Sequence, residues 1–548
     1  MAQYLSPGVY VEEIPSAVKP IAGVGTSTAG FIGIYSGSVG IPIQNNDYDP
    51  THPTTPEKDN TPGAGGGVNL PYEITYFNPS DDDLARIEDP ATKADEEAAA
   101  AEATVQQAEA DAKTAEKNRA GAPEDKRAAD VARTAAMTAA KARANARNLR
   151  MKANHLLDMA LAARMTRPGD DELKQLEDAA AKEAPGTPRA RELHDKAARA
   201  RITQAQYGHA VEPGRAKLCT SFHDFERFFG TFSINPDHNR LAHGVYGFFN
   251  NGGNRCFVIH FDNEADAMNL RAFDSIDEIA IVAAPGVLSE AVQQAIVDHC
   301  ENLGDRFAIL DGKNIDSETD PVEDEIKVIG YSDYAAMYFP WLTVFDITRK
   351  RLDPIGDGKI NVAPSGHMAG IYAHVDNTRG VHKAPANEVP RGALGVSYPV
   401  SKAIQDGLNP HGVNCIRDLN GNIRVWGART WGGDANLDYK YINVRRLMLF
   451  LRESIDEGTQ WVVFEPNDPS LWAKIVRNVS AFLLNVWRDG ALFGTTPQEA
   501  FYVKCDASTN PPEVRDLGRV VTEIGVAPVK PAEFVIFRIS QWAGPQTK

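Results

Sequence analysis

Three histidines in one stretch of the chain, His367, His374 and His382, are the residues best suited to metal chemistry. Imidazole nitrogen is a common zinc ligand, and protein zinc sites use ligands at short, characteristic spacings. Here the spacings are seven and eight residues, which match no common zinc pattern. Ser365 could act as a nucleophile, but His367 stands where a nucleophile elbow requires glycine. We therefore interpret the histidines as structural, in a tight irregular loop, and keep a metal hydrolase around His367 as an alternative.

Two glycine-rich stretches could surround a phosphate group. Gly23 and Gly25 begin like a dinucleotide-binding fingerprint, but Thr28 stands where the third glycine is needed. The stretch GAGGG from Gly63 is not followed by the Lys-Ser or Lys-Thr pair of a P-loop. Neither stretch predicts a nucleotide site, and we expect no cofactor, no metal and no catalytic residue.

Arg445 and Arg446 lie close to Tyr439 and Tyr441, a combination that could bind phosphate or stack on a base. The whole chain, however, has 57 basic and 74 acidic residues and a net charge of −17. A chain this acidic is a poor general binder of nucleic acid or of anionic lipid. We therefore expect the two arginines to form ion pairs within or between subunits, and we expect no nucleic acid contact.

Length and composition describe an ordinary globular protein. At about 150 residues per domain, 548 residues predict several domains. No segment approaches the ~20 apolar residues that span a membrane, and the first ten residues lack the basic and apolar regions of a secretory signal. The five cysteines are scattered and contain no CxxC pair, which argues against disulfides and against a zinc ribbon. We expect folding in a reducing cytoplasm.

Both ends of the chain have the pattern of isolated strands. A run of Gly, Ser, Thr and Ala follows the first strand and provides a possible hinge at Gly23, Gly25 and Gly30. Each strand could pair with a distant strand of its own chain, or it could be an arm that pairs with another subunit. The apolar residues of the two strands are Val9, Tyr10, Val11 and Ile14 at the start, and Phe534, Val535, Ile536, Phe537 and Ile539 at the end.

The composition changes twice in the first 215 residues. Residues 41–80 are dense in Pro and Gly, which predicts a loop or linker without helix or sheet. Residues 81–215 are rich in Ala, Glu, Lys and Arg, which favour helix. We expect three or four helices there, forming a hairpin or small bundle. Asp89 and Pro90 are the expected N-cap and first residue of one helix.

From residue 216 the sequence alternates between strand and helix patterns. Strands are expected at Glu278–Gly286 and Arg306–Gly312, with an amphipathic helix at Leu288–Gly304 between them, and this order predicts a βαβ unit. The last 200 residues predict two helices, Asn443–Gly458 and Ser470–Gly490, the second capped by Ser470. A strand is expected between them, at Trp461–Pro466. The predicted fold class is α/β (α+β), with several domains.

A series of motifs runs in order along the chain outside residues 41–215. It comprises SPGVYVEEIPS, TSTAGFIG, TSFHDFERFFG, VYGFFNNGGNRCFVIHF, YFPWLTVFD, VAPSGHMAGIYAHVDNTRGVHKAPAN, LNPHGVNCIR, WGARTW, YINVRRL, FEPNDPSLW and PAEFVIFRISQ. This series resembles the contractile tail sheath proteins of phages and of phage-tail-like injection particles. The insertion of residues 41–215 departs from the family pattern, in which the first two motifs are followed closely by the third.

The resemblance implies a mechanism without bond-making chemistry. Subunits would form hexameric rings stacked around an inner tube, and terminal arms would add strands to sheets of neighbouring subunits. A baseplate would trigger contraction, which drives the tube through a target envelope. The implied partners are copies of the same chain, the inner tube protein, and baseplate and terminator or cap proteins, with no direct insertion into a membrane. A static filament or shell protein with strand exchange is the second alternative.

The resemblance also implies where the parts of the chain lie. Part of the C-terminal domain would line the inner wall, which makes Lys474, Arg477 and Arg488 possible contacts to the tube. Assembly would take place in the bacterial cytoplasm, in a phage tail, an exported particle or a cytoplasmic injection machine. The predicted domains are an N-terminal arm and start of the core (1–40), a linker (41–80), an inserted helical domain on the outer surface (81–215), an α/β domain (216–350), and a C-terminal core domain with a strand arm (351–548, arm 532–541).

Overall fold

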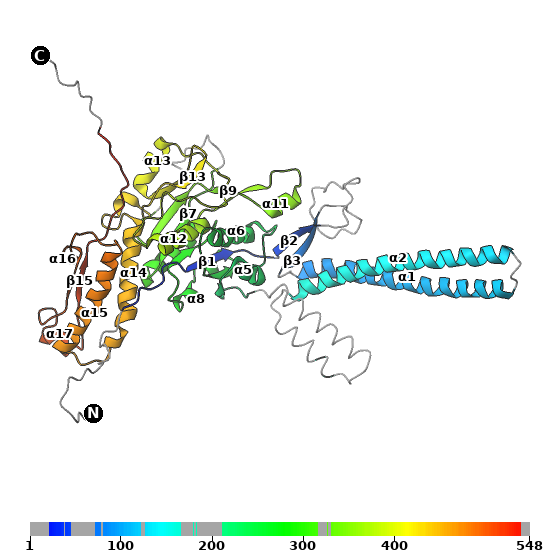
Figure 1. The fold of residues 1–548 in the computed structure, drawn as a ribbon, viewed down its shortest axis with the longest axis horizontal. Helices are drawn as coiled ribbons and strands as arrows, with labels where there is room; N and C mark the ends of the chain where they lie inside the picture. Colours follow the sequence, from blue (N-terminus) through cyan, green and yellow to red (C-terminus); the bar gives the residue numbers. More distant parts are fainter. Residues whose placement is uncertain are drawn as a thin grey trace, which may run out of the picture.

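A computed structural model describes residues 21–37, 39–44, 72–77, 81–121, 126–165, 211–315 and 330–538, together with residues 179, 182 and 326. The described parts form a central α/β body, a C-terminal lobe on one side of it, and a long helical hairpin that projects from the other side (Figure 1). The predicted N-terminal strand, Val9 to Ile14, and the last predicted arm residue, Ile539, lie outside the described residues.

The body is built on an eight-stranded sheet in the order β13-β12-β8-β7-β6-β1-β5-β4. Neighbouring inner strands pair in parallel, and the two outermost strands pair antiparallel. Because β1 pairs with both β5 and β6, the amino-terminal part of the chain runs through the middle of the sheet. The strands are β1 (Ala29–Ile34), β4 (Lys217–Cys219), β5 (Cys256–Phe261), β6 (Ile281–Ala283), β7 (Phe307–Asp311), β8 (Ala335–Phe339), β12 (Val413–Leu419) and β13 (Asn422–Val425).

Helices cover both faces of this sheet. Side chains alternate along a strand, so Phe31 packs with α6 (Pro236–Asn250) and α12 (Ser365–Arg379) on one face, while Ile32 packs with α9 (Glu290–Leu303) on the other. The predicted βαβ unit is confirmed as β6, α9 and β7. Shorter elements complete the body: α5 (Phe222–Phe229), α7 (Glu264–Ala267), α8 (Arg271–Asp274), α11 (Ile347–Leu352), α13 (Lys402–Leu408), η1 (Asn409–His411), η2 (Gly433–Ala435), and a small sheet of β9 (Leu342–Phe345), β10 (Lys359–Val362) and β11 (Gly395–Val396).

The irregular loop predicted around His367 is wrong, because these residues form the buried helix α12. The glycines of α12 allow close packing against a neighbouring helix and do not form a turn. A Cβ atom at Gly366 would collide with the backbone of Gly244, and one at Gly370 would collide with the backbone of Phe248. The glycines therefore let α12 lie directly against α6, which composition alone does not reveal.

The prediction that residues 41–80 contain no sheet is also wrong. β2 (Val39–Gln44) pairs antiparallel with β3 (Tyr72–Phe77), and Val39 faces Phe77 across the pair. Short runs of β-branched and aromatic residues stabilise each other across strands even when the sequence between them disfavours regular structure. The Pro- and Gly-rich residues between the strands lie outside the described residues.

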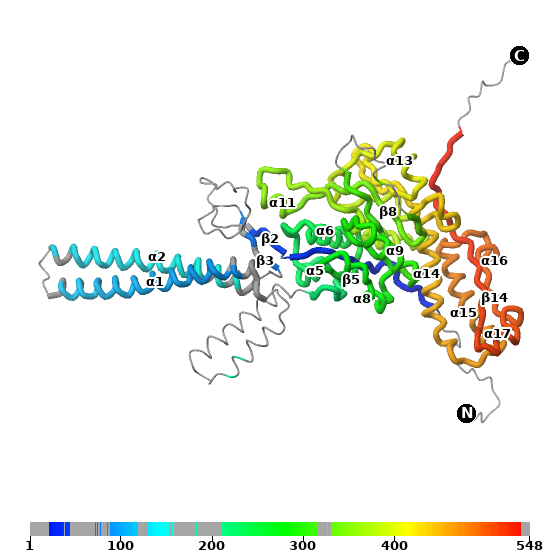
Figure 2. The backbone as a smooth tube through the Cα atoms, turned by 180° about the vertical axis from the view of Figure 1, so that it is seen from behind, coloured from blue at the N-terminus to red at the C-terminus, as the bar shows by residue number. Residues whose placement is uncertain are grey.

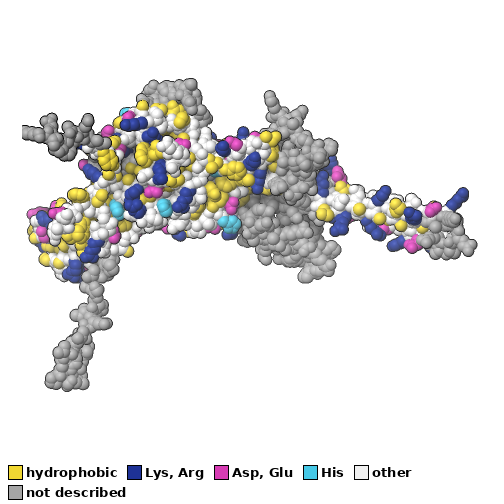
Figure 3. Space-filling view, turned by 45° about the horizontal axis from the view of Figure 1, so that its top comes forward, with side chains coloured by type: hydrophobic (Ala, Val, Ile, Leu, Met, Phe, Trp, Pro, Cys, Tyr) yellow, Lys and Arg dark blue, Asp and Glu magenta, His cyan; other side chains and the backbone are white. Residues whose placement is uncertain are grey.

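The projecting hairpin consists of α1 (Asp81–Gly121) and α2 (Lys126–Met165), which lie side by side along their length (Figures 1 and 2). At 1.5 Å per residue each helix is about 60 Å long. Ala98 and Ala153 are fully buried between the helices, and Arg150 bonds Asp95 and Glu102 across them. Charged side chains line the outer surface (Figure 3). Pro90 is not the start of a helix as predicted, since α1 begins nine residues earlier.

The C-terminal lobe has its own apolar core. Leu447 and Leu451 of α14 (Ile442–Thr459) pack with Ile475, Val479 and Phe482 of α15 (Pro469–Arg488). The remaining elements are η3 (Gln460–Val462), α16 (Pro497–Ala500), α17 (Pro512–Asp516), and a two-stranded sheet of β14 (Phe501–Lys504) and β15 (Glu523–Val526). No helix in the described part of the chain has the length and apolarity needed to cross a membrane.

Two sequence predictions in this lobe are wrong. The strand expected at Trp461–Pro466 is a 3₁₀ turn that prolongs α14, followed by Phe464 in the left-handed region at φ 67°. The cap of α15 is Asp468 rather than Ser470, because the Asp468 side chain accepts a hydrogen bond from the Leu471 amide. Pro469 then occupies the first turn, where its missing N–H costs nothing.

Two buried histidines are expected to make the folding stability of the body sensitive to acid. Burial lowers the pKa of His238 and of His260 to about 4. Because an exposed histidine in the unfolded chain titrates near 6.5, the unfolded state binds more protons between these values. Each histidine is then expected to remove up to about 3 kcal/mol of folding stability as the pH falls from about 6.5 towards 4.

We expect the His260→Gln variant to lose less stability than the parent over this pH range, measured by denaturant unfolding. His223, whose side chain is 75% exposed, provides the matched control in His223→Gln. Parallel pH profiles for the parent and His260→Gln would contradict the assignment.

Candidate assembly arm and its anchor

The C-terminal segment leaves the body as an exposed apolar segment that pairs with no described strand. Phe534, Val535, Ile536 and Phe537 are 69%, 69%, 79% and 83% exposed. No residue from Phe534 to Arg538 makes a hydrogen bond with another described residue. Figure 2 shows this segment, in red, extending away from the C-terminal lobe. We call residues 534–538 the C-terminal arm. Its apolar, β-branched and aromatic residues favour a strand once a partner strand is available.

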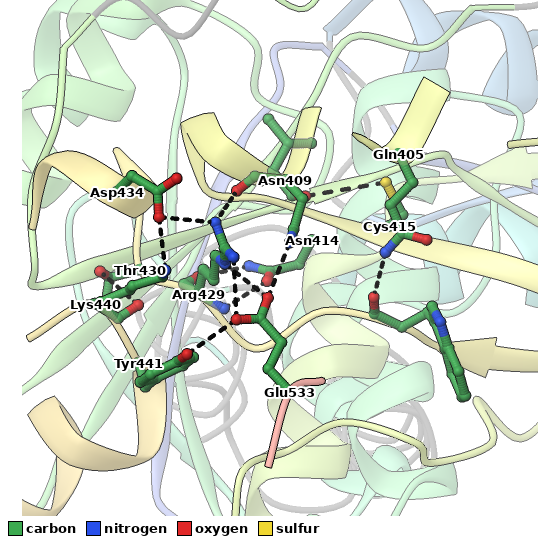
Figure 4. A network of polar contacts seen from close by, with 12 residues as sticks. Gln405, Asn409, Asn414, Cys415, Arg429, Thr430, Asp434, Lys440, Tyr441 and Glu533 are labelled. Atoms are coloured by element: carbon green, nitrogen blue, oxygen red, sulfur yellow. Dashed lines mark hydrogen bonds and ion pairs between the residues drawn. The ribbon is translucent and has the colours of Figure 1, made fainter. Parts of the chain in front are cut away.

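The arm is held at its base by Glu533, whose carboxylate is the centre of a polar network (Figure 4). Arg429 donates two hydrogen bonds to it, from Nε at 2.7 Å and from Nη2 at 3.0 Å. Asn409 Nδ2 and the Tyr441 hydroxyl each donate another at 2.9 Å. We call these four residues the arm anchor. A two-pronged Arg–carboxylate pair fixes direction as well as distance.

Arg429 is itself firmly placed, with only 4% of its surface exposed. Its Nη1 donates to the Asn409 carbonyl at 3.0 Å and to Asp434 at 3.1 Å. Its backbone N–H donates to Asn414 Oδ1, on the sheet strand β12, at 2.8 Å. The arm is therefore connected through Arg429 to the central sheet of the body.

The charge states of the anchor follow from this geometry. Burial acts to raise the pKa of Glu533, but the hydrogen bonds from Arg429, Asn409 and Tyr441 outweigh it and hold this pKa below its ordinary value. Burial, and then the hydrogen bond to Glu533, raise the pKa of Tyr441 to about 12. At neutral pH the anchor thus consists of a carboxylate, a guanidinium and a neutral phenol.

The amino-terminal end of the described chain leaves from the opposite end of α14. Ile21 packs against Gly458, near the last turn of that helix, whereas Tyr441 and the arm anchor lie at its first turn. Ile21 and the base of the C-terminal arm therefore lie at opposite ends of this helix.

The residues predicted as a hinge divide into two groups. Gly30 lies inside the buried strand β1 and is paired on both sides, so its assignment to a hinge is corrected. Gly23 and Gly25 precede the strand and are exposed. Thr26, which lies between these glycines and β1, fixes the chain to the body. Its Oγ1 donates to Asp376 at 2.7 Å, and its carbonyl accepts a hydrogen bond from Arg446 at 2.8 Å.

The predicted tube-contact residues all lie on α15. Arg477 and Arg488 are exposed and eleven residues apart, which is three helical turns, so they lie on one face. Lys474 is half-buried beside them. None of the three forms an ion pair with any described residue. The small sheet of β14 and β15 lies in the same lobe, and no further strand of the described chain pairs with its two outer edges.

The residues singled out for other chemistry have structural roles. The ion-pair prediction for Arg445 and Arg446 is confirmed: Arg445 pairs with Asp333, and Arg446 pairs with Asp376 at 2.7 Å. His367 is buried in α12, and burial, with His243 nearby, lowers its pKa to about 3. Among the described residues no three His, Cys, Asp or Glu side chains gather where they could hold a metal.

Sequence reasoning did not identify the arm anchor. Glu533 is a single acid within the run PAEFVIF, and Arg429 is a single arginine within WGARTW. The sequence offers one indication of the anchor: each residue is an isolated charge within a mostly uncharged motif, and such a residue often forms a buried ion pair. The pairing itself spans 104 residues and cannot be seen without the fold.

Comparison with known proteins gives two family matches. Residues 264–431 match the phage tail sheath protein central domain, and residues 434–541 match the phage tail sheath C-terminal domain. Together these matches cover 276 of the 548 residues. The central-domain match includes Arg429, and the C-terminal match includes Glu533.

Individual relatives agree with these matches. The chain is 29% identical over 201 residues to the tail sheath protein of Burkholderia phage BcepMu, covering 35% of this chain and 39% of that protein. It is 27% identical over 187 residues to the tail sheath protein of Vibrio phage KVP40, covering 33% and 27% of the two chains. The alignments therefore span well under half the length of these curated relatives.

Solved structures share both sequence and fold with the chain. A chain from the PVC sheath complex, an extracellular contractile injection system in its contracted state, is 28% identical with a TM-score of 0.53, covering 62% of this chain and 89% of that one. A chain from the anti-feeding prophage baseplate is 28% identical with a TM-score of 0.52, covering 60% and 90%.

Proposed function

The chain belongs to the phage tail sheath family, and we propose that it is the repeating subunit of a contractile sheath that surrounds an inner tube. The observation that carries the proposal is the exposed C-terminal arm, which is anchored rigidly at Glu533 and has no partner strand within the described chain. Contraction would change the packing between subunits while the arms keep them connected. The metal hydrolase and the static filament are not favoured.

The arms would act by strand addition. The outer edges of the β14–β15 sheet offer unpaired backbone groups, and a two-stranded sheet gains stability from additional strands. We propose that the terminal strands of neighbouring subunits, Val9–Ile14 and Phe534–Ile539, add to these edges. Gly23 and Gly25 would then allow the body to rotate while the N-terminal strand stays paired.

The direct test is electron microscopy of the purified chain, alone and with its tube protein. Two tubular states of different length and diameter are expected, the longer one only with the tube. A single tubular state under all conditions would indicate a static filament, and a persistent monomer would contradict the proposal.

The inner tube would bind along α15. Unpaired cations on one exposed helix face fit a tube protein with an acidic outer surface. We expect Lys474→Glu combined with Arg477→Glu to reduce co-assembly with the tube severalfold, while tube-free contracted sheath still forms. Co-sedimentation at low and raised salt provides the measurement, since exposed charge pairs weaken with ionic strength.

Arg515→Glu in α17 is the matched control, because Arg515 is an exposed cation of the same lobe outside α15. Co-assembly of the Lys474/Arg477 variant that equals the parent at both salt concentrations would remove the electrostatic argument.

The helical insert would be a surface decoration outside the tube-lining lobe. The hairpin α1–α2 buries its apolar residues mainly against itself and lies on the side of the body away from the C-terminal lobe (Figure 1). We expect replacement of residues 81–215 by a short Gly/Ser linker to leave tube formation intact, with a smaller outer diameter in electron micrographs. A variant that stays monomeric at concentrations where the parent assembles would assign the insert a structural role.

The remaining assignments follow from the family. We propose hexameric rings, with baseplate proteins at one end and terminator or cap proteins at the other. Assembly would occur in the bacterial cytoplasm before the particle acts as a phage tail, an exported particle or a cytoplasmic injection machine.

A further inference from the structure

The turn between α14 and α15 exposes two apolar side chains to solvent instead of burying them in the core of the lobe. Val463 is 63% exposed. Phe464, at 103%, is the most exposed apolar side chain of the described residues. Phe464 also has the left-handed backbone, at φ 67°, that bulky residues avoid. A strained, fully exposed aromatic residue indicates a contact outside the chain. We call Val463 and Phe464 the exposed corner.

The surroundings of the exposed corner are acidic. Asp456 and Glu457 lie in the last turn of α14, and Glu465 and Asp468 lie beside Phe464. All four are exposed, and none forms an ion pair with a described residue. A partner for this corner should therefore present an apolar cavity with a basic rim.

Such a cavity is present at the other end of α14. A groove of about 990 Å³ opens beside the arm anchor, lined by seven basic and only three acidic residues in a chain whose net charge is −17. Arg379, Lys402 and Lys530 of its lining form no ion pair with a described residue. Trp426, 41% exposed, gives it an aromatic wall. We call this cavity the basic groove.

One chain cannot bring its own corner into its own groove. Tyr441, which precedes α14, lines the groove, and Phe464 follows the end of α14. The 18 residues of this helix separate the two sites by about 27 Å at 1.5 Å per residue. The helix is packed into the core of the lobe, so this separation is fixed.

We propose that the exposed corner of one subunit docks into the basic groove of a second copy of this chain. Phe464 would pack against Trp426, and the carboxylates beside it would face Lys402 and Lys530. A contact between different surfaces of identical chains repeats head to tail, and it builds a closed ring if the rotation closes or an open helical assembly if it does not. The inference rests on the proposed sheath function and identifies a lattice contact separate from the arms.

Cysteine pairing tests the contact directly. All five native cysteines are buried, so introduced thiols are the reactive ones. We expect Glu465→Cys chains mixed with Asp406→Cys chains to form disulfide-linked dimers with an added oxidant, whereas each variant alone forms few. Val131→Cys, at a 60% exposed position of the hairpin, replaces Glu465→Cys as the control. Cross-linking of the mixture at the control level would overturn the proposal.

Assembly measurements separate this proposal from the sheath function itself. We expect Phe464→Ala to raise the concentration needed for polymerisation at least tenfold, and Phe493→Ala, at a 73% exposed phenylalanine, to leave it unchanged. Glu465→Lys and Lys402→Glu should each weaken assembly, and their combination in one chain should restore it. If the parent polymerises and Phe464→Ala polymerises equally well, this inference is wrong and the sheath proposal stands; if the parent does not polymerise, the sheath proposal fails.

Discussion

A chain that ends at Glu533 is expected to fold normally and to lose polymerisation. The truncation removes the exposed apolar residues of the C-terminal arm. These residues form no hydrogen bond with another described residue and do not belong to the core of the lobe. In an assembly the same residues would gain backbone hydrogen bonds worth about 0.5–1.5 kcal/mol each. Burial of each large apolar side chain would add about 1.5–3 kcal/mol. Removal of the arm is therefore expected to cost far more free energy of association between subunits than free energy of folding within one subunit.

The measurement is analytical sedimentation with electron microscopy of the truncated chain, together with its thermal unfolding. A second truncation, which deletes residues 532–548, also removes Glu533 and leaves Arg429 with Asp434 as its one carboxylate partner among the described residues. This shorter chain should be less stable as well as monomeric, so the pair of variants separates arm from anchor. Deletion of residues 1–18 should block polymerisation in the same way. Sheaths of normal length from any of these chains would mean that the arms pair within their own subunit.

The sequence was sufficient for the elements of the body that have local signatures. The βαβ unit was predictable because β6, α9 and β7 have short apolar strands, a helical period and a glycine stop at Gly304. The two long helices of the lobe were predictable for the same reason. The terminal arm was visible as an apolar strand without a neighbour in the sequence to pair with.

The features that could not be predicted from the sequence depend on contacts between residues far apart in the chain. The glycines of α12 suggest a loop until α6 is seen packed against them, and β2 gains its partner only from residues beyond a long Pro- and Gly-rich stretch. The arm anchor joins residues 104 positions apart, and the basic groove gathers residues from 379 to 534. Periodicity and composition report local structure, whereas these sites arise from tertiary packing.

Loss of the anchor carboxylate should uncouple the arm from the body. We expect Glu533→Ala to destabilise the subunit by about 3 kcal/mol, because removal of one partner leaves the largely buried Arg429 cation without its main counter-charge. The arm itself is retained, so strand addition remains possible, but its direction is no longer fixed. Polymers should therefore form at higher concentration and contract incompletely.

Glu533→Gln sharpens this prediction, because it keeps the shape of the side chain and the acceptor oxygen while it removes the charge. It should fall between the parent and Glu533→Ala in denaturant unfolding and in sheath length. Glu523→Gln, an exposed acid of β15, is the matched control. If Glu533→Ala matched the parent in both stability and contraction, the network around Glu533 would be incidental to the arm.

The pH dependence of the anchor has a definite sign. The pKa of Glu533 in the folded chain lies below its ordinary value of 4.5, so its stabilising contribution is complete above that value and is lost as the pH falls below it. The difference in unfolding free energy between the parent and Glu533→Gln should therefore be constant near neutral pH and shrink in acid. A difference that grew on acidification would require the folded parent to bind a proton more readily than its unfolded chain, the opposite of a lowered pKa, and the anchor carboxylate would then not be the titrating site. Because the same carboxylate fixes the arm, the arm should also lose its orientation in this acidic range, and sheath assembly of the parent should approach that of Glu533→Gln there.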